Sequence, residues 1–122
     1  MNAVRGLQTF IARRGDDDAG FLAVKLHNPQ AAEVYVMGVL RAHHGRGIGT
    51  ALLAAAEESL DAAGVMYLQV KTLGASRESR GYDATRRFYE SRGFVPLEEF
   101  PDLWPGNPCL LLVKRIGAAA AS

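Results

Sequence analysis

The sequence is poor in the features that mark secreted or membrane-spanning proteins. Cys109 is its only cysteine, so the chain cannot form an internal disulfide, which suits a reducing cytoplasm. No apolar run approaches the ~18–20 residues that a membrane-spanning helix needs. The N-terminus MNAVRGLQTF lacks the basic region, long apolar stretch and small-residue cleavage site of a signal peptide. We therefore expect a cytoplasmic protein.

A large charge of one sign is also missing. Lysines and arginines number 14 and aspartates and glutamates 13, which gives a net charge of +1. No strong field therefore favours nucleic acid or an anionic membrane as a partner. With 122 residues, of which 48% are hydrophobic, the chain can bury a core without disulfides or metals. We expect one domain over residues 1–116 and a disordered tail over residues 117–122, where small residues have nothing to bury.

The pattern of apolar residues predicts a mixed α/β fold. Three strands come first, and their connections are too short for a crossover helix, so they form an antiparallel meander. An amphipathic helix and a strand follow, which gives a strand–helix–strand unit with parallel strands. A second helix and two further strands complete a mostly antiparallel sheet of about six strands. The expected strands are 7–13, 21–26, 33–40, 65–72, 93–100 and 108–116, the helices are 48–63 and 83–92, and 73–82 and 101–107 are irregular.

What the sequence does have is a glycine-rich junction between the third strand and the first helix. Gly45, Gly47 and Gly49 alternate there. Such a junction exposes backbone N–H groups at the positive end of the helix dipole, and this arrangement binds phosphate. Glycine is needed because a Cβ atom would hold the anion away from the backbone. The chain is therefore predicted to bind a phosphorylated ligand.

Two common glycine motifs do not fit this junction. A dinucleotide-binding fingerprint that starts at Gly47 needs a third glycine where Leu52 stands, and no acidic residue follows at the expected place. A P-loop needs a lysine before its serine or threonine, whereas Gly49 precedes Thr50. Neither motif therefore identifies the ligand.

Residues 44–49, HGRGIG, resemble the acetyl-CoA-binding signature of the GNAT N-acetyltransferase superfamily, in which Arg/Gln-x-x-Gly-x-Gly/Ala opens a long helix. Residues 85–94, TRRFYESRGF, resemble the second signature of the family, A-x-x-F/L-Y-x-x-x-G-F. Two positions depart: His44 stands where Arg or Gln is usual, and Thr85 replaces a small alanine. The resemblance covers residues 21–116. It implies the GNAT fold, acetyl-CoA as cosubstrate, and acetyl transfer to a primary amine by direct attack in a ternary complex.

The resemblance also implies roles for particular residues. The amides of the glycine-rich turn would hold the diphosphate of CoA, and a strand amide near Val39 or Leu40 would point at the thioester carbonyl. Tyr89 would give its proton to the departing thiolate; a core tyrosine stacked beside Phe88 is the alternative. The expected cosubstrate-binding residues are Val39, Leu40, His44, Gly45, Arg46, Gly47, Ile48, Gly49 and Thr50.

Glu33 is the candidate base for deprotonating the amine. It stands where the histone-acetylating branch of the superfamily carries its glutamate, and it would need burial or a water relay to act on an alkylammonium. A surface glutamate at a strand end is the alternative. His43 and His44 are competing bases, although their place beside the phosphate turn favours a structural or phosphate-contacting role. His27 is expected to be a turn residue.

The acceptor site is predicted less specifically. Trp104, Glu98 and Glu99 belong to an aromatic, acidic segment that could line an acceptor pocket for a cationic amine; a loop that caps the core is the alternative. Cys109 is expected to be a buried apolar residue and not an acyl carrier. Four basic residues near the second helix could contact the 3′-phosphate of CoA: Arg77, Arg80, Arg86 and Arg87. The alternative is that these side chains are simply solvated.

The front of the chain departs from the family pattern. The family usually begins with a strand and two helices that wall the acceptor pocket, whereas only two strands fit before Glu33. The pocket is then either open or completed by a neighbouring subunit, and an exposed sheet edge favours a homodimer. A non-catalytic acyl-CoA sensor or scaffold with the same fold is the alternative function, and a structural interaction domain is a third. A polyamine, aminoglycoside, amino acid or protein could be the acceptor.

Overall fold

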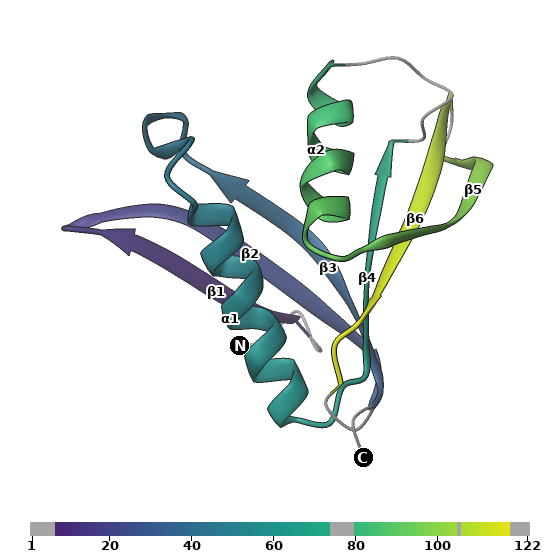
Figure 1. Ribbon diagram of the computed structural model, residues 1–122, viewed down its shortest axis with the longest axis horizontal. Helices are drawn as coiled ribbons and strands as arrows, with labels where there is room; N and C mark the ends of the chain where they lie inside the picture. The colour runs from purple at the N-terminus through teal and green to yellow at the C-terminus, as the bar shows by residue number, and fades with distance from the viewer. Residues whose placement is uncertain (1–6, 74–79, 105, 118–122) are drawn as a thin grey trace. The chain divides into compact units, whose positions relative to one another are not determined.

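The computed structural model describes residues 7–73, 80–104 and 106–117. This part of the chain holds a six-stranded sheet of order β1-β2-β3-β4-β6-β5 and two α-helices (Figure 1). The mixed, mostly antiparallel α/β fold predicted from the sequence is therefore confirmed. The elements are β1 (Leu7–Arg14), β2 (Asp17–Asn28), β3 (Ala31–Val39), the 3-10 helix η1 (Arg41–His43), α1 (Ile48–Ala62), β4 (Tyr67–Leu73), α2 (Arg80–Ser91), β5 (Val95–Trp104) and β6 (Asn107–Arg115).

The chain divides into two compact units. The first runs to Leu68 and takes in Ile116 and Gly117, whereas the second is Gln69–Arg115. Within the first unit, the Met66 amide donates to the Gln30 carbonyl (2.8 Å), just before β3 begins. The Met66 carbonyl in turn accepts hydrogen bonds from the amides of Ile116 (2.8 Å) and Gly117 (3.2 Å). Gly117 is therefore held in the fold, and the predicted tail does not begin there; residues 118–122 lie outside the described residues.

The first unit is an antiparallel meander, β1-β2-β3, with α1 along one face (Figure 1). Gly20 lets α1 approach the sheet closely, because a Cβ atom there would lie 3.1 Å from Ile48 Cγ2 and 3.3 Å from Leu52 Cδ1. Leu22 and Val24, two and four residues further along β2, are buried, as alternation places them on the same face. The core of this unit therefore lies between α1 and the meander.

The amphipathic pattern predicted α1 to within one residue. Leu52, Leu53, Ala56 and Leu60 are its buried stripe, spaced at the three- and four-residue steps of a helix face. Gly64 ends the helix with a φ angle of +92°, and the Val65 amide donates to the Leu60 carbonyl (2.9 Å). This left-handed glycine is the helix terminator that the sequence indicated.

The second unit contains α2 and an antiparallel β5–β6 hairpin. Tyr89 and Phe94 are buried at the end of α2 and just after it, and Cys109 and Leu112 are fully buried on β6. Cys109 is thus the buried apolar residue that was expected. Three bounds were predicted wrongly. In the first unit, β2 begins at Asp17, four residues before the predicted start. In the second unit, α2 begins at Arg80, three residues before the predicted start, and most of the expected loop 101–107 is strand, since β5 runs to Trp104 and β6 starts at Asn107.

In the described ranges, neither helix is long and apolar enough to cross a membrane.

Candidate functional site

The loop between β3 and α1 has a backbone that favours glycine. Gly45 and Gly47 have φ angles of +77° and +75°, in the left-handed region that costs other residues roughly 1–2 kcal/mol. A Cβ atom at either position would meet nothing within 4 Å. Gly49 lies within the first turn of α1. The glycines therefore shape a loop with open space beside its backbone, as a phosphate site requires.

The N–H groups and the positive dipole at the N-terminus of α1 are not neutralised by side chains of the helix. Its N-cap residue, Gly47, makes no side-chain cap hydrogen bond, and the first turn carries no acidic residue. The N–H groups that open an α-helix have no acceptor within it, and they carry the positive end of the helix dipole. Donors, dipole and open space thus coincide, and the diphosphate of CoA fits this end of the helix.

The side chain of His44 links the loop to the end of β3 by a hydrogen bond. Its Nε2 donates a hydrogen bond to the Val39 carbonyl over 2.9 Å; the proton must be on Nε2, because a carbonyl only accepts. The Nε2–H group is therefore engaged within the protein. Of the two roles expected for His44, structural and phosphate-contacting, this bond favours the structural one.

The two backbone amides at the end of β3 face opposite edges of the strand. The Leu40 amide donates to the Ala19 carbonyl (2.8 Å), so the prediction that it could serve the thioester is wrong. Because hydrogen-bonding direction alternates along an antiparallel strand, Val39, paired with Gly20, directs its amide to the edge away from β2. Met37, paired with Leu22, does the same. Sequence reasoning missed Met37 because the direction of an amide depends on the strand register.

Glu33 lies on the same strand but far from these amides. It is only 8% exposed, and its Oε1 accepts a hydrogen bond from His27 Nε2 over 2.6 Å. Six residue steps separate Glu33 from Val39, about 20 Å in an extended strand, and Met37 is still about 13 Å away. Direct proton abstraction by Glu33 beside either amide is therefore excluded, and only a water relay could connect them. His27, expected in a turn, lies on β2 as the partner of Glu33.

Tyr89 is buried on α2 in the second unit, with 4% of its surface exposed. Its ring makes edge contacts with Phe88 and Phe94, at centroid distances of 5.2 and 5.3 Å. Burial raises the pKa of Tyr89 to about 12. The phenol therefore stays protonated at physiological pH, as a general acid must, yet it is a weaker acid than a thiol of pKa about 8.5. The acid role stays a prediction.

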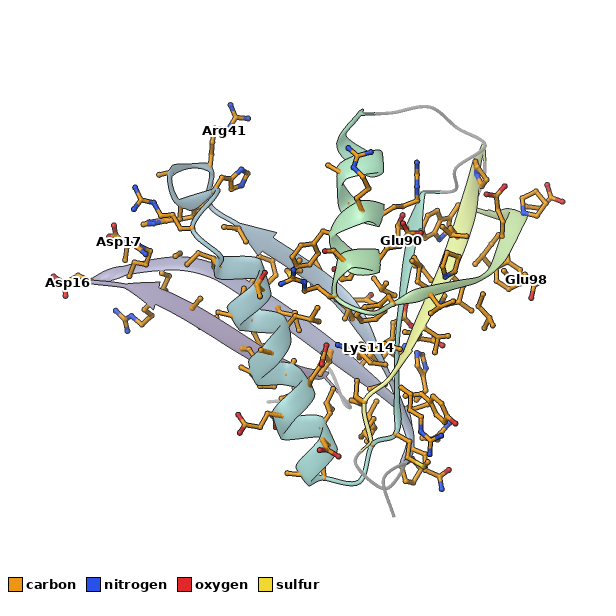
Figure 2. The ribbon with its side chains drawn as sticks, viewed as in Figure 1. Asp16, Asp17, Arg41, Glu90, Glu98 and Lys114 are labelled. Atoms are coloured by element: carbon orange, nitrogen blue, oxygen red, sulfur yellow. The ribbon has the colours of Figure 1, made fainter. Side chains whose placement is uncertain are left out.

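The predicted acceptor residues lie on the β5–β6 hairpin of the second unit. Glu98 pairs with Leu111 and Glu99 with Leu110, so these neighbouring side chains point to opposite faces of the sheet. Glu98 is exposed (Figure 2), whereas Glu99 is half-buried. Trp104 pairs with Asn107 near the hairpin tip. The two glutamates therefore do not share a face of the sheet, and the role of Trp104, Glu98 and Glu99 in acceptor binding stays a prediction.

An apolar hollow of about 540 Å³ adjoins Val39 in the first unit. Gly38 leaves room for the ring of Phe21, since a Cβ atom there would lie 2.7 Å from Phe21 Cε1. Ile11 pairs with Phe21 across the sheet and is 54% exposed, and Leu40 is 55% exposed. The hollow had no signal in the sequence beyond the alternation of apolar residues along the three strands. It is lined by Ile11, Asp18, Gly20, Phe21, Gly38, Val39 and Leu40.

The fold and the glycine-rich loop define a class of protein that matches a known family. Residues 5–96 match the family model of the acetyltransferase (GNAT) domain. The chain therefore belongs to the GNAT acetyltransferase family, whose cosubstrate is acetyl-CoA. Among curated proteins, no sequence matches this chain.

Solved structures share the fold over most of the chain. A GNAT-family protein from Desulfovibrio desulfuricans is 25% identical, with a TM-score of 0.82, over 92% of this chain and 70% of that one. The ribosomal-protein-S18-alanine N-acetyltransferase from Escherichia coli is 19% identical, with a TM-score of 0.77, over 93% and 71%. A GNAT acetyltransferase from Elizabethkingia anophelis with acetyl-CoA bound is 15% identical, with a TM-score of 0.77, over 90% and 76%. The last two likenesses establish the fold alone.

Proposed function

We propose that this acetyltransferase transfers the acetyl group of acetyl-CoA to a primary amine by direct attack in a ternary complex. The observation that carries the proposal is the junction between β3 and α1. There, an open loop with left-handed glycines at Gly45 and Gly47 meets an uncompensated helix N-terminus. The Val39 amide lies on the edge of the strand that leads into this loop. One segment thus offers sites for both the diphosphate and the thioester carbonyl of one ligand.

The proposed reaction divides the work between backbone and side chains. The amine lone pair attacks the thioester carbon, a C–N bond forms, and the C–S bond then breaks. The Val39 or Met37 amide donates to the carbonyl oxygen while it carries negative charge, and one such donor contributes about 3–4 kcal/mol. Tyr89 gives its proton to the leaving thiolate and afterwards takes a proton back from solvent. The proton that the amine loses passes to solvent, directly or along waters that reach Glu33.

The hollow beside Val39 suggests what the acceptor carries next to its amine. Its walls include the exposed apolar side chains of Ile11, Phe21 and Leu40. Its charged residue, Asp18, already pairs with Arg13 over 3.3 Å. An amine on an apolar body would bury its carbons there, and each buried CH₂ group contributes about 0.8 kcal/mol. We therefore favour such an amine over a polyamine or an aminoglycoside.

A thiol-release assay with acetyl-CoA and a panel of amines tests this function. The panel contains phenylethylamine, a peptide with a free N-terminus, lysine, spermidine and an aminoglycoside. We expect at least one amine, the apolar one foremost, to raise CoA release about tenfold above the amine-free rate, which corresponds to about 1.4 kcal/mol of barrier. Tight CoA binding with no release from any amine would contradict the catalytic proposal.

A non-catalytic acyl-CoA-binding module is the second candidate, and the position of Glu33 favours it. The predicted base is engaged by His27 at 2.6 Å and lies about 20 Å along the strand from Val39. Such a module would bind acetyl-CoA and CoA without turning either over. The same assay, combined with calorimetry of CoA binding, separates the two functions.

We further propose that the chain forms a homodimer through the open side of the meander. β1 is an edge strand of the sheet, and edge strands offer unpaired backbone groups to a second chain. The hollow that Ile11 and Phe21 line, with 54% and 38% of their surfaces exposed, would be completed by the second chain and would remain open to the acceptor. Light scattering after size exclusion should give twice the 13.2 kDa chain mass, and Ile11→Lys should shift it to the monomer. A monomeric wild type at high concentration would refute this.

A further inference from the structure

A second hollow, of about 570 Å³, lies beside the glycine-rich loop in the first unit. It is lined by Arg14, Gly15, His43 and Arg46. Arg14 ends β1, and Gly15 opens the two-residue turn to β2. Arg46 stands in the loop itself, between the two left-handed glycines. The β1–β2 hairpin and the phosphate loop therefore share one opening.

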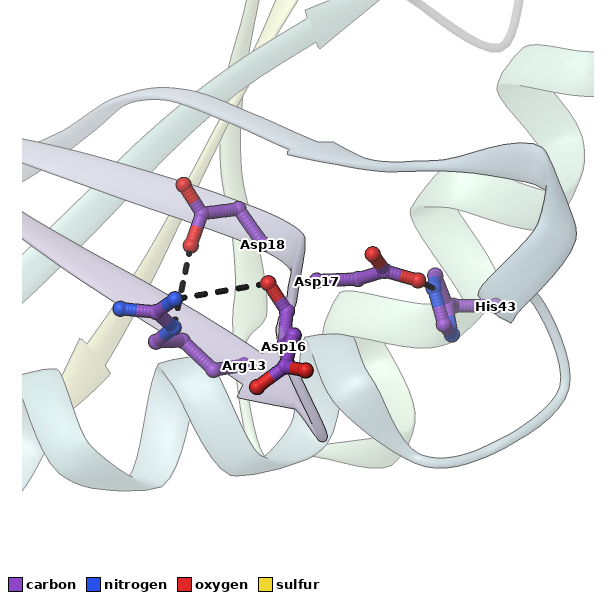
Figure 3. Close-up of polar contacts among 5 residues, drawn as sticks. All are labelled: Arg13, Asp16, Asp17, Asp18 and His43. Carbon is purple, nitrogen blue, oxygen red and sulfur yellow. Dashed lines mark hydrogen bonds and ion pairs between the residues drawn. The ribbon is translucent and has the colours of Figure 1, made fainter.

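The hairpin carries three acidic residues, of which Asp18 is paired away from the hollow. Arg13 Nε pairs with Asp18 Oδ1 over 3.3 Å, and Arg13 also donates to the Asp16 carbonyl over 3.4 Å (Figure 3). The carboxylate of Asp17 points toward His43, with 4.0 Å between Oδ2 and Nε2. Although Arg14 and Asp17 are register partners across the hairpin, their side chains form no ion pair. The carboxylate of Asp17 therefore faces a wall of the hollow and would oppose an anion bound there, and Asp16 adds a second negative charge beside Gly15.

The two arginines of the hollow are left without a counter-charge. Within the described residues, neither Arg14 nor Arg46 forms an ion pair. The wall contains a further unsatisfied atom, because His43 Nδ1 is buried and has no hydrogen-bond partner among the described residues. Guanidinium groups suit phosphate, since their planar donors match its oxygens. The hollow is therefore built for an anion and not for a cationic amine.

The chemistry of CoA indicates which anion. CoA carries a diphosphate and, on the adjoining ribose, a 3′-phosphate monoester that holds nearly two negative charges at neutral pH. Arg46 lies two residues before α1, so a diphosphate at the N-terminus of this helix would bring the adjoining ribose toward Arg46. We propose that Arg14 and Arg46, and not the arginines near α2, bind the 3′-phosphate of the cosubstrate, so that this hollow selects CoA over its dephosphorylated form. The inference rests on the proposed function, and it assigns a residue of the β1–β2 hairpin to cosubstrate recognition.

The test is calorimetric binding of CoA and of 3′-dephospho-CoA to the full chain. We expect wild type to bind CoA about tenfold more tightly, which corresponds to about 1.4 kcal/mol. Arg14→Ala should remove most of this preference by weakening CoA binding alone. Arg46→Ala should weaken both ligands, and CoA more. Arg14→Lys keeps a charge and should restore part of the preference.

Two other arginines serve as matched controls. Arg13 neighbours Arg14 but is paired with Asp18, and Arg41 is an exposed arginine on η1 that does not line the hollow (Figure 2). Arg13→Ala and Arg41→Ala should keep the tenfold preference. Asp17→Asn removes the opposing carboxylate and should increase the preference about two- to threefold, in line with a modest exposed charge interaction.

The outcomes separate this inference from the function on which it rests. Equal affinity of wild type for the two ligands would overturn the inference while leaving CoA binding intact. An equal loss of the CoA preference in Arg13→Ala, Arg14→Ala and Arg41→Ala would also overturn the inference, because such a loss would reflect only the overall positive charge of the surface. If neither ligand binds, the proposed function fails together with the inference.

Discussion

Gly47→Ala is expected to weaken CoA binding about tenfold or more and to lower the free energy of unfolding by roughly 1–2 kcal/mol. The stability loss arises because Gly47 has a φ angle of +75°, which strains any residue with a Cβ atom. The binding loss has a different cause. The new methyl group would occupy the open space beside the loop, and it would keep the diphosphate from the N–H groups of α1, whose charge-assisted hydrogen bonds contribute about 1.5–3 kcal/mol each.

Gly64→Ala is the control that separates these two effects. Gly64 ends the same helix with a φ angle of +92°, and a Cβ atom there would also meet nothing within 4 Å. The substitution should therefore cost a similar 1–2 kcal/mol while leaving CoA affinity unchanged. Urea unfolding gives the stability of each variant, and calorimetry gives the dissociation constant for CoA. If both variants bind CoA equally well, the loop between β3 and α1 is not the diphosphate site.

The meander and α1 could be predicted because their signals are local. Leu52, Leu53 and Leu60 repeat at helical spacing, and Gly64 then stops the helix. The β1–β2 turn is equally local, since only Gly15 and Asp16 separate the strands. These elements are specified by short-range patterns that a single sequence contains, and their bounds were predicted to within a few residues.

The β5–β6 hairpin was predicted poorly because its extent depends on the sheet. Pro101 suggested a loop, since proline cannot donate a hydrogen bond to a strand ladder. However, β5 is an edge strand of the sheet, and an edge strand tolerates a proline whose missing N–H would face away from its neighbour. The ladder is irregular between Phe100 and Trp104, as expected where a proline interrupts the pairing.

The candidate site likewise combines features that the local sequence predicts with features that depend on strand pairing. The glycine positions of the diphosphate loop follow from the sequence, because left-handed φ angles require glycine. The direction of each β3 amide does not, since it depends on pairing: Leu40 turns its amide toward Ala19, whereas Val39 and Met37 turn theirs away from β2. The hydrogen bond between Glu33 and His27 likewise depends on the register of β2 and β3. Roles that need register or contact therefore had to await the structure.

Tyr89→Phe is expected to lower the rate of acetyl transfer about 10²-fold, the low end of the contribution of a positioned general acid, with CoA affinity unchanged. Burial raises the pKa of Tyr89 to about 12, so a full transfer of its proton to a free thiolate of pKa about 8.5 would be uphill by roughly 5 kcal/mol. Proton transfer therefore has to accompany C–S cleavage, while the sulfur is desolvated and more basic. Tyr35→Phe, on an exposed tyrosine, should leave the rate unchanged.

The same pKa makes a prediction about stability that does not depend on catalysis. The folded-state pKa of about 12 lies above the unfolded value of about 10. The contribution of Tyr89 is therefore fully present below pH 10, and it is lost as the pH rises from 10 through 12. The total loss approaches 3 kcal/mol, at 1.36 kcal/mol per pKa unit. Urea unfolding at pH 8, 10 and 11.5 should show this fall in wild type and in Tyr35→Phe, but a smaller one in Tyr89→Phe. If Tyr89→Phe keeps both the wild-type rate of acetyl transfer and the wild-type fall in unfolding free energy at alkaline pH, the phenol is neither the general acid nor a group that titrates near pH 12.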